Sequence, residues 1–354
     1  MNFLKILIIV LVFLAVIIGA PVLILFRDAG EFKKITTHFS GLCTDIKGVH
    51  SSEDITIHPV IGLAFISSCD RRALSLGRQP RQGAIFGFDL KGTIAELVNL
   101  TTDFKKPFRP HGIGLWLDED GRTALFVVNH PPGGHFVEIF DLKENRLVHR
   151  ESISDPLMHS PNDVVPVGPG SFYVTNDHGN TSKSGRTLED YLRLARSYVL
   201  FYDGTNFRKV AGDLKYANGI NLSLDGKTIY VAATVGRRIV LYDRDLQNGD
   251  LTYRDEINLA TGVDNIDVDE EGNLWVGAHP KLLTFVKYSK NPDVLSPSQV
   301  LKITPHEKGP YGIEEIYLDR GDIFSGSSVA VVYADTLLVG SVFDPRFLLC
   351  RIKP

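Results

Sequence analysis

The stretch NGINLSLDGKTIYVAA, residues 218–233, decides the fold of this chain. A short run of alternating apolar residues leads into the pair Asp225-Gly226, and a β-branched and aromatic run follows it. Asp-Gly between two such runs is typical of a tight β-hairpin turn. The segment therefore predicts two antiparallel strands joined at residues 225–226.

Five similar segments occur elsewhere, each with a polar first residue, a short apolar run, a turn signal and a second apolar run. They begin at Glu53, His111, Asn162, Asp264 and Ser328. With Asn265 as the mark of the fifth segment, the spacings run from 47 to 63 residues. Repeats of several short strands at about this length are typical of propeller blades. The sequence predicts one all-β domain over residues 28–354, a six-bladed β-propeller.

The composition agrees with a large folded domain. The chain has 354 residues, 44% of them hydrophobic, and 38 Lys and Arg against 42 Asp and Glu, a net charge of −4. This apolar content excludes intrinsic disorder, and 32 glycines are too few for collagen. Because no basic block is present, nucleic acid is not expected as the main partner.

The amino terminus carries a long apolar segment. Residues 6–26, ILIIVLVFLAVIIGAPVLILF, contain no charge over 21 positions. About 20 apolar residues span a bilayer, whereas a cleavable signal peptide has a shorter apolar core. Since Pro21 follows the small-residue site, cleavage is disfavoured, and we expect residues 1–27 to form an uncleaved signal-anchor. A removed signal peptide and a buried core helix are the alternatives.

Cysteines and sequons indicate the side of the membrane. Of three cysteines, Cys43 and Cys350 lie near the ends of the body. Asn-x-Ser/Thr sequons occur at Asn99, Asn180 and Asn221, of which the first two are expected in loops and to be glycosylated. These features favour a membrane-anchored protein of the secretory pathway, with the body on the lumenal or extracellular side.

Hairpin symmetry places many polar residues at one end of the propeller, where inner strands converge on the central channel. These residues are His111, His130, Asn162, Asp177, His178, Asn218, Asp264, Asn265 and His279. A subset offers only oxygen, the ligand that Ca²⁺ prefers. That subset is Glu53, Asn162, Asn218, Asp264 and Asn265. Each is an ordinary turn or strand-end residue when taken singly, but their recurrence at one phase predicts a calcium site; no Cys/His cluster has zinc spacing.

Seven strings in order resemble the paraoxonase/arylesterase family and run from about Cys43 to Cys350. They are SSEDITIHP–GLAFISS, PHGIGLW, VVNHP, PNDVVPVGP–FYVTNDH, YANGINLSLDGKTIY, VDNIDVD–GNLWVGAHP and GSSVAVVY. The resemblance implies a six-bladed propeller with two calcium ions in a central tunnel, one catalytic and one structural. It also implies calcium-dependent hydrolysis of lactones and aryl esters.

The resemblance assigns roles to single residues. It gives the catalytic calcium the five oxygen ligands named above, and the structural calcium Asp54, Asp163 and a backbone carbonyl near Ile113. It gives a catalytic dyad to His111 and His130, with His111 as the general base that activates water on a calcium-polarised carbonyl. A metal-bound carboxylate such as Glu53 or Asp264 is the alternative base.

The resemblance also implies a disulfide between Cys43 and Cys350. Such a link would close the ring and contribute on the order of 5 kcal/mol in the chain-entropy model. The family's free cysteine near the tunnel corresponds to Ala278, and Cys69 lies elsewhere, as an expected buried filler. The Arg-rich residues 70–82 follow no family pattern, so substrate choice stays open.

An amphipathic helix is predicted over residues 187–199, TLEDYLRLARSYV, with Thr187 and Asp190 as a capping box. It is expected to be a lid on the propeller, or an interfacial helix that lies on the membrane beside the anchor. Either role gives a hydrophobic entrance, which favours lipophilic lactones or aryl esters. The competing functions are a sugar lactonase-like or strictosidine-synthase-like enzyme and a non-catalytic binding propeller.

Overall fold

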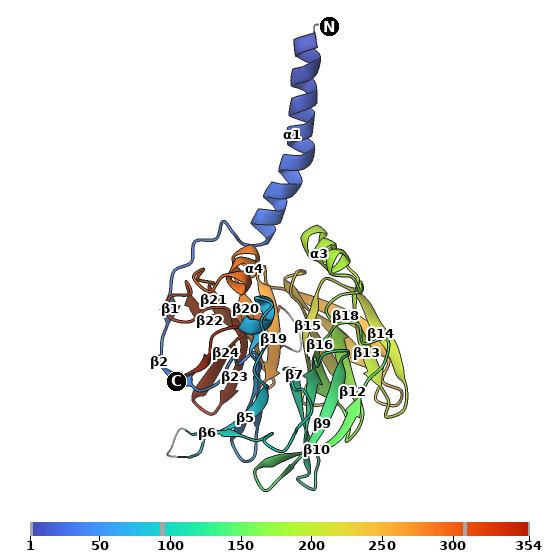
Figure 1. Cartoon of the computed structure of the whole chain (residues 1–354), viewed down its shortest axis with the longest axis vertical. Helices are drawn as coiled ribbons and strands as arrows, with labels where there is room; N and C mark the ends of the chain where they lie inside the picture. Colours follow the sequence, from blue (N-terminus) through green and yellow to red (C-terminus); the bar gives the residue numbers. More distant parts are fainter. Residues whose placement is uncertain (1–2, 93–95, 307–309, 353–354) are drawn as a thin grey trace.

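Short antiparallel strands follow one another along the chain, as the repeated hairpins predict. The computed structural model describes residues 3–92, 96–306 and 310–352, and within them 25 strands form six sheets. The innermost strand of each sheet contacts the innermost strand of the next sheet, and that of the sixth sheet contacts that of the first. The ring is a six-bladed β-propeller (Figure 1), which confirms the predicted fold.

Blades one to three are four-stranded. Blade one has β3 (Asp54–His58), β4 (Leu63–Ser68), β5 (Ala84–Asp89) and β6 (Leu97–Asn99). Blade two has β7 (Pro110–Leu117), β8 (Thr123–Asn129), β9 (Phe136–Lys143) and β10 (Arg146–Ile153). Blade three has β11 (Pro161–Pro166), β12 (Phe172–Asn176), β13 (Ser197–Tyr202) and β14 (Phe207–Leu214).

Blades four to six complete the ring. Blade four has β15 (Ala217–Leu222), β16 (Thr228–Ala233), β17 (Arg238–Arg244) and β18 (Leu251–Asn258). Blade five has β19 (Gly262–Val268), β20 (Leu274–His279), β21 (Ser298–Thr304) and β22 (Gly312–Asp319), with β1 (His38–Phe39) on its outer edge. Blade six has β23 (Ser327–Tyr333), β24 (Thr336–Ser341), β25 (Arg346–Arg351) and β2 (Leu42–Lys47).

The two ends of the body close blade six. β2 pairs antiparallel with β25, and Cys43 lies opposite Cys350 in this register. The two cysteines form a disulfide across a sequence separation of 307 residues, and Cys69 is free and buried. Such a bond is typical of secretory or extracellular compartments, which agrees with the predicted secretory pathway.

Apolar side chains fill the interfaces between blades. Phe126 on β8 packs against Phe172 on β12 with ring centroids 5.8 Å apart. Phe88 on β5 meets Phe347 on β25 edge to face at 5.5 Å, where the ring closes. Full burial of a side chain of this kind contributes about 1.5–3 kcal/mol. Each blade therefore stabilises the next, and the inner strands are held in a fixed ring.

Four helices lie outside the sheets of the described residues: α1 (Phe3–Asp28), α2 (Arg71–Ser75), α3 (Lys183–Leu192) and α4 (Leu282–Lys290). The last three follow the second strand of their blades, and Figure 1 shows α1, α3 and α4 at one end of the propeller. The Glu31 carboxylate accepts hydrogen bonds from the backbone N–H groups of Leu283 and Thr284 at 2.9 and 3.0 Å. Glu31 thereby caps α4 and holds the base of α1 at this end of the molecule.

The predicted helix over residues 187–199 is wrong in its bounds. Ser182 caps α3 by accepting from the Gly185 N–H, and Arg193 ends it in a left-handed conformation, φ 53°. The capping box at Thr187 is therefore not the start of the helix. Residues 197–202 belong to β13 because they pair along β12 and bury their side chains between blades.

The predicted apolar N-terminal helix is present as α1, which contains Pro21. Among the residues whose side chains the structure describes, which leave out many of α1, no helix is long and apolar enough to cross a membrane. The anchor over residues 1–27 therefore stays a prediction that the structure does not support.

Candidate active site

The polar residues singled out in the sequence lie at the start of the inner strands, where the backbone is irregular. The ladder between the two innermost strands shifts register between Pro161 and Val164, and between Val263 and Ile266. The same kind of shift occurs in β7, β15 and β23. A bulge places two residues opposite one and re-aims their side chains. The bulges of β11 and β19 each hold a pair of adjacent polar residues, Asn162-Asp163 and Asp264-Asn265, whereas those of β7 and β15 hold one polar residue and a glycine.

Glycines allow the inner strands to approach one another at these bulges. A Cβ added to Gly112 would lie 2.3 Å from Oδ1 of Asp163, and one added to Gly219 would lie 2.6 Å from backbone atoms of Asp264 and Asn265. Contacts this short are not found for real side chains. Glycine is required here so that carboxylates and amides from neighbouring blades can meet.

Glu53 is a buried carboxylate that several blades share. Its Oε1 lies 3.4 Å from Nε2 of His111, and its Oε2 lies 3.5 Å from the Arg71 guanidinium. Nδ2 of Asn265 donates to the Glu53 carbonyl at 2.9 Å and to its carboxylate at 3.2 Å. Burial alone would raise the pKa of Glu53, but these positive charges and hydrogen bonds lower it to about 2. Glu53 is therefore an anion that faces the channel.

Three amides present free carbonyl oxygens. The buried Oδ1 atoms of Asn162, Asn218 and Asn265 have no hydrogen-bond partner among the described residues. Their Nδ2 groups are used, since Asn162 donates to Asp177 at 3.3 Å and Asn218 donates to Thr234 at 3.0 Å. An unpaired buried carbonyl costs roughly 1–3 kcal/mol, so three at one site indicate a missing partner with positive charge.

Asp264 is a second buried carboxylate beside these amides. Nε2 of His279 lies 2.8 Å from its Oδ2, and Asn218 donates to its Oδ1. Both His279 and Asp264 are buried. Burial raises the pKa of Asp264, although His279 acts in the opposite direction. Hairpin symmetry predicts His279 at this end, but no sequence pattern predicts its contact with Asp264.

Two further carboxylates, Asp54 and Asp163, form a second group. Asp54 accepts from the Ile113 N–H at 2.7 Å, and Asp163 accepts from the Ile220 N–H at 2.8 Å. Burial raises the pKa of Asp54 well above its usual range, and the charge of Asp163 adds to this effect. These carboxylates are ones that a divalent cation would stabilise.

His111 and His130 are in hydrogen-bond contact, as the dyad requires. Nδ1 of His111 lies 2.9 Å from Nε2 of His130. The Ser67 hydroxyl donates to the His111 carbonyl at 2.6 Å and fixes the strand that carries it. Burial, with the charge of His111, lowers the pKa of His130 well below its usual range. His130 is therefore neutral at physiological pH and can orient His111.

Two groups beside the site were not predicted. Arg71 on α2 approaches Glu53, and its buried Nε has no partner among the described residues. The Arg-rich composition of residues 70–82 was the signal for it. His135 lies 2.8 Å, Nδ1 to Nδ1, from His130, and its only signal was its position five residues further along the chain.

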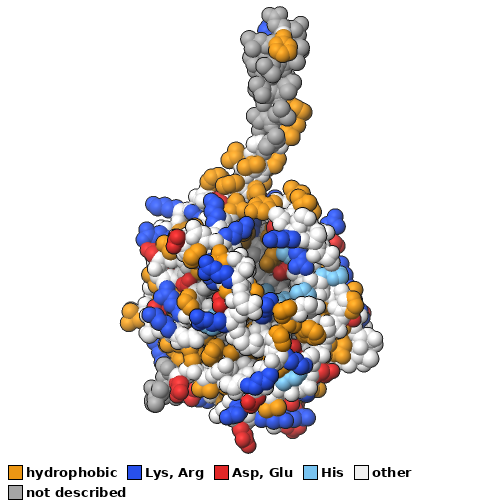
Figure 2. Space-filling model, viewed as in Figure 1, with side chains coloured by type: hydrophobic (Ala, Val, Ile, Leu, Met, Phe, Trp, Pro, Cys, Tyr) orange, Lys and Arg blue, Asp and Glu red, His pale blue; other side chains and the backbone are white. Residues whose placement is uncertain are grey.

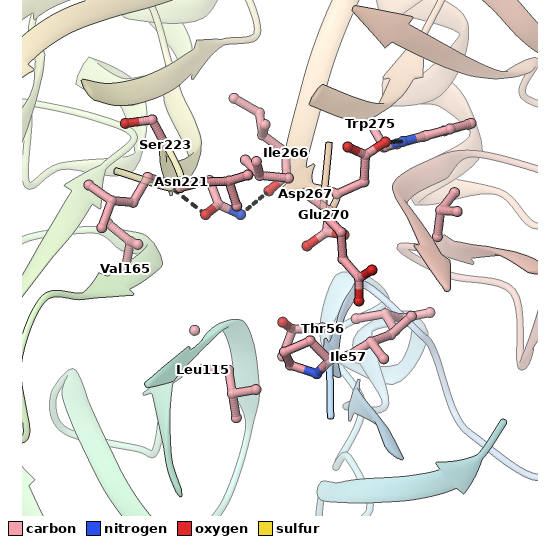
Figure 3. A pocket seen from close by; sticks show the side chains of 18 of the residues that line it. Thr56, Ile57, Leu115, Val165, Asn221, Ser223, Ile266, Asp267, Glu270 and Trp275 are labelled. Atoms are coloured by element: carbon pink, nitrogen blue, oxygen red, sulfur yellow. Dashed lines mark hydrogen bonds between the residues drawn. The ribbon is translucent and has the colours of Figure 1, made fainter. Parts of the chain in front are cut away.

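A cavity of about 1330 Å³ occupies the opposite end of the channel, where the hairpins turn. Figure 3 shows side chains of five blades around it, among them Thr56, Leu115, Val165, Asn221 and Asp267. Asp54, Asp163 and Ile113 line this cavity. The five residues predicted to hold the catalytic calcium, here called the upper set, do not line it: Glu53, Asn162, Asn218, Asp264 and Asn265. The second carboxylate group therefore lies between the cavity and the upper site.

The other end faces the helices. Figure 2 shows Lys, Arg and His side chains around a hollow on the face below α1. Phe285 of α4 stacks on His279 with ring centroids 3.8 Å apart, and Phe343 lies 5.9 Å from Phe285. The upper site thus combines buried carboxylates with an aromatic wall.

The donors fit calcium better than a softer metal. In the part of the chain that the structure describes, no group of three or more His, Cys, Asp or Glu could hold a metal ion. The upper set differs in kind, because three of its five members offer amide oxygens that are buried and unpaired. Carboxylate and amide oxygens suit Ca²⁺.

Comparison with known proteins points to one family. Residues 31–352 match the family model described as Arylesterase. Human serum paraoxonase/arylesterase 1 is 39% identical over 320 residues, 88% of each chain. Human serum paraoxonase/lactonase 3 is 37% identical over 308 residues, 85% of this chain and 86% of that protein.

Solved structures with low identity share the fold. A luciferin-regenerating enzyme superposes with a TM-score of 0.56 at 13% identity and covers 88% of this chain and 95% of that chain. Regucalcin from Agrobacterium tumefaciens, titled a calcium-binding protein, gives 0.54 at 15% identity over 91% and 98%. At such identities the likeness shows the propeller fold alone.

Proposed function

We propose that this chain, which belongs to the arylesterase family, is a carboxylic-ester hydrolase that acts on lactones and aryl esters. Its relatives carry the names paraoxonase, arylesterase and lactonase, and the match covers most of both chains. The observation that carries the proposal is the set of three buried, unpaired amide oxygens beside Glu53, Asp264 and the His111–His130 pair. A sugar lactonase-like activity is not favoured, because two gluconolactonase neighbours are only 16% identical.

Calcium is the cofactor we propose, with two ions. The upper ion would be held by Glu53, Asn162, Asn218, Asp264 and Asn265. The deeper ion would be held by Asp54, Asp163 and the carbonyl of Ile113. When bound, the upper ion supplies a Lewis acid that polarises the ester carbonyl and stabilises the oxyanion.

The dyad supplies the base in this proposal. The contact between Nδ1 of His111 and Nε2 of His130 leaves Nε2 of His111 on the side of Glu53. This nitrogen takes a proton from water as the oxygen attacks the carbonyl carbon. Collapse of the tetrahedral intermediate breaks the ring or aryl ester bond, and the leaving oxygen receives a proton from Nε2 of His111.

The surroundings favour lipophilic substrates. Phe285 and Phe343 line one side of the site, and Leu188, Tyr191 and Leu192 expose 55%, 44% and 62% of their surface on α3. We propose that α3 borders the entrance and rests on lipid, and that residues 1–27 anchor the chain. The proposed anchor rests on 21 uncharged residues, and carbonate extraction of membranes tests it.

The compartment is proposed to be lumenal or extracellular. Asn99 is exposed at the end of β6 and is the better glycan acceptor. Nδ2 of Asn180 donates to Glu189, so glycosylation there would break a buried contact. A mobility shift on endoglycosidase treatment, lost in Asn99→Gln, tests the first site.

The deciding experiment is hydrolysis of a medium-chain δ-lactone and of phenyl acetate by the purified full chain. EDTA should abolish both activities, and added Ca²⁺ should restore them. Asn265→Ala, which removes one free amide oxygen, should weaken calcium binding measured by calorimetry. Asn206→Ala, a turn residue on the outer edge of blade three, is the matched control. Activity that is indifferent to EDTA would refute the calcium proposal.

A further inference from the structure

The histidine pair of the site continues into a third histidine. Nδ1 of His130 lies 2.8 Å from Nδ1 of His135, and Nδ1 of His111 lies 2.9 Å from Nε2 of His130. The rings of His130 and His135 meet edge to face with centroids 4.9 Å apart. The two outer rings, His111 and His135, each use one nitrogen toward His130. The central ring, His130, uses both of its nitrogens.

His135 is held in place although it lies in a loop. It follows Gly133 and Gly134 in the connection from β8 to β9. The Ser154 hydroxyl donates to its carbonyl at 2.8 Å, which ties this loop to the end of β10. His135 is half-buried. His135 is therefore a fixed ring near the surface. It lies on the side of His130 that faces away from His111.

Several groups act on His135. Burial lowers its pKa, and so do the charges of Arg186 on α3 and of His111. The charge of Asp177 and a hydrogen bond with the backbone of His159 act in the opposite direction. The net shift keeps the ring neutral at rest, so that it has one donor and one acceptor nitrogen.

We propose that His135 is the outer end of a proton relay, which connects the base at His111 with solvent through His130. The inference rests on the proposed function, since the attacking water must lose a proton and the leaving oxygen must gain one. His135 touches no substrate; it acts through His130. A pair of histidines alone would leave the proton on a buried ring, whereas three give it a path out.

The protons balance over one turnover. Nε2 of His111 takes a proton from water, Nδ1 of His111 passes its proton to Nε2 of His130, and Nδ1 of His130 passes its proton to His135. Nε2 of His135 then releases a proton to solvent, and all three rings are neutral in the other tautomer. The reverse movement carries one proton from solvent to the leaving oxygen, which resets the rings. The carboxylic acid product loses its own proton, so the sum is ester and water in, carboxylate, alcohol and one proton out.

The variant His135→Gln distinguishes a role in proton transfer from a role in holding the His130 ring. The glutamine carbonyl can still accept from His130 and hold the ring, but an amide does not carry protons. In dilute buffer we expect kcat to fall by about tenfold with KM unchanged, less than the roughly 10²–10⁴-fold that loss of a general base costs. Added imidazole should restore kcat in the variant and leave the wild type unchanged. His306→Gln, an exposed histidine after β21, is the matched control.

A second readout does not depend on activity. Proton NMR of the full chain should show a downfield imidazole N–H for the His130–His135 contact, and His135→Phe should remove it. A fall in kcat that imidazole does not rescue would mean that His135 only supports the fold, and would overturn the relay. An active wild type with an unaffected His135→Gln would do the same. A wild type without ester or lactone hydrolysis would overturn the proposed function and the relay with it.

Discussion

Removing the disulfide between Cys43 and Cys350 should destabilise the whole propeller rather than one blade. The bond joins β2 to β25, and Cys350 is fully buried. Without it, β2 is attached to blade six through its ladder with β25, the Asp45–Arg346 ion pair and the packing of Ile46, since β2 lies at the outer edge of that sheet. The last blade therefore depends on the N-terminal strand for its fourth member, and loss of the bond loosens the ring at its closure.

The magnitude follows from the closed loop. In the chain-entropy model a loop of 307 residues is worth about 5–6 kcal/mol at 25 °C. A body of this size has an unfolding entropy of about 0.7 kcal/mol/K, so the loss corresponds to a fall in Tm of about 8 °C. Most of this effect acts on the unfolded chain, which gains freedom when the bond is absent.

Calorimetry of Cys43→Ala/Cys350→Ala at a fixed calcium concentration measures the effect. Reduction of the wild type should reproduce the fall in Tm, and the reductant should leave the double variant unchanged. Cys69→Ala removes the free buried thiol and keeps the bond, so it is the matched control. A decrease in Tm of less than about 2 °C would refute the reasoning, because the β2–β25 ladder would then hold the ring without the disulfide.

Three other measurements test the site and its supports. Burial alone would lower the pKa of His178, but its hydrogen bonds to Asp177 and to an aspartate of α3 raise it to about 9. The charged form of His178 therefore stabilises the fold fully below its ordinary pKa of 6.5, and this stabilisation is lost as the pH rises through about 9. The free energy of unfolding in urea that His178→Gln removes should shrink between about pH 6 and pH 10. A loss that grows over this range would contradict the reasoning. Gly219→Ala should lower the free energy of unfolding by more than about 2 kcal/mol, because the new Cβ meets the backbone of β19 at 2.6 Å, whereas Gly170→Ala in an open turn should change it little. His111→Asn should lower kcat for a lactone by roughly 10²–10⁴-fold with Tm unchanged, and an equal kcat would exclude His111 as the base.

The fold and the set of polar residues could be predicted because both follow from the strand pattern. A hairpin fixes which residues share an end, so Asn162, Asn218 and Asn265 could be assigned to one face without coordinates. The free amide oxygens at these three positions agree with that assignment. Their role as ligands stays a prediction until calcium binding is measured.

The loops could not be predicted in this way. His135 and Arg71 reach the site from connections whose course depends on tertiary packing, so no local period marks them. The end of α3 was missed for a related reason. Tyr198 and Val199 fit a helical period with Leu188. Their pairing with β12 stabilises the fold more than a longer helix would, since both side chains are buried there. Where two local patterns overlap, the packing between blades decides.

The charge of the channel gives a reason for two ions rather than one. Four of the proposed ligands are buried carboxylates from three blades: Glu53, Asp54, Asp163 and Asp264. A buried charge without a partner is costly, and the side chains of His111, His279 and Arg71 approach only Glu53 and Asp264. One calcium at the upper level would leave Asp54 and Asp163 facing each other without compensation. Two divalent cations balance four carboxylates. The bulge at Asn162-Asp163 supplies one proposed ligand to each level of the channel, and Glu53-Asp54 does the same at the regular start of β3. Asp163→Asn should therefore lower calcium binding to one ion per chain, counted by calorimetry, while a chain that binds a single ion before the substitution would refute the charge argument.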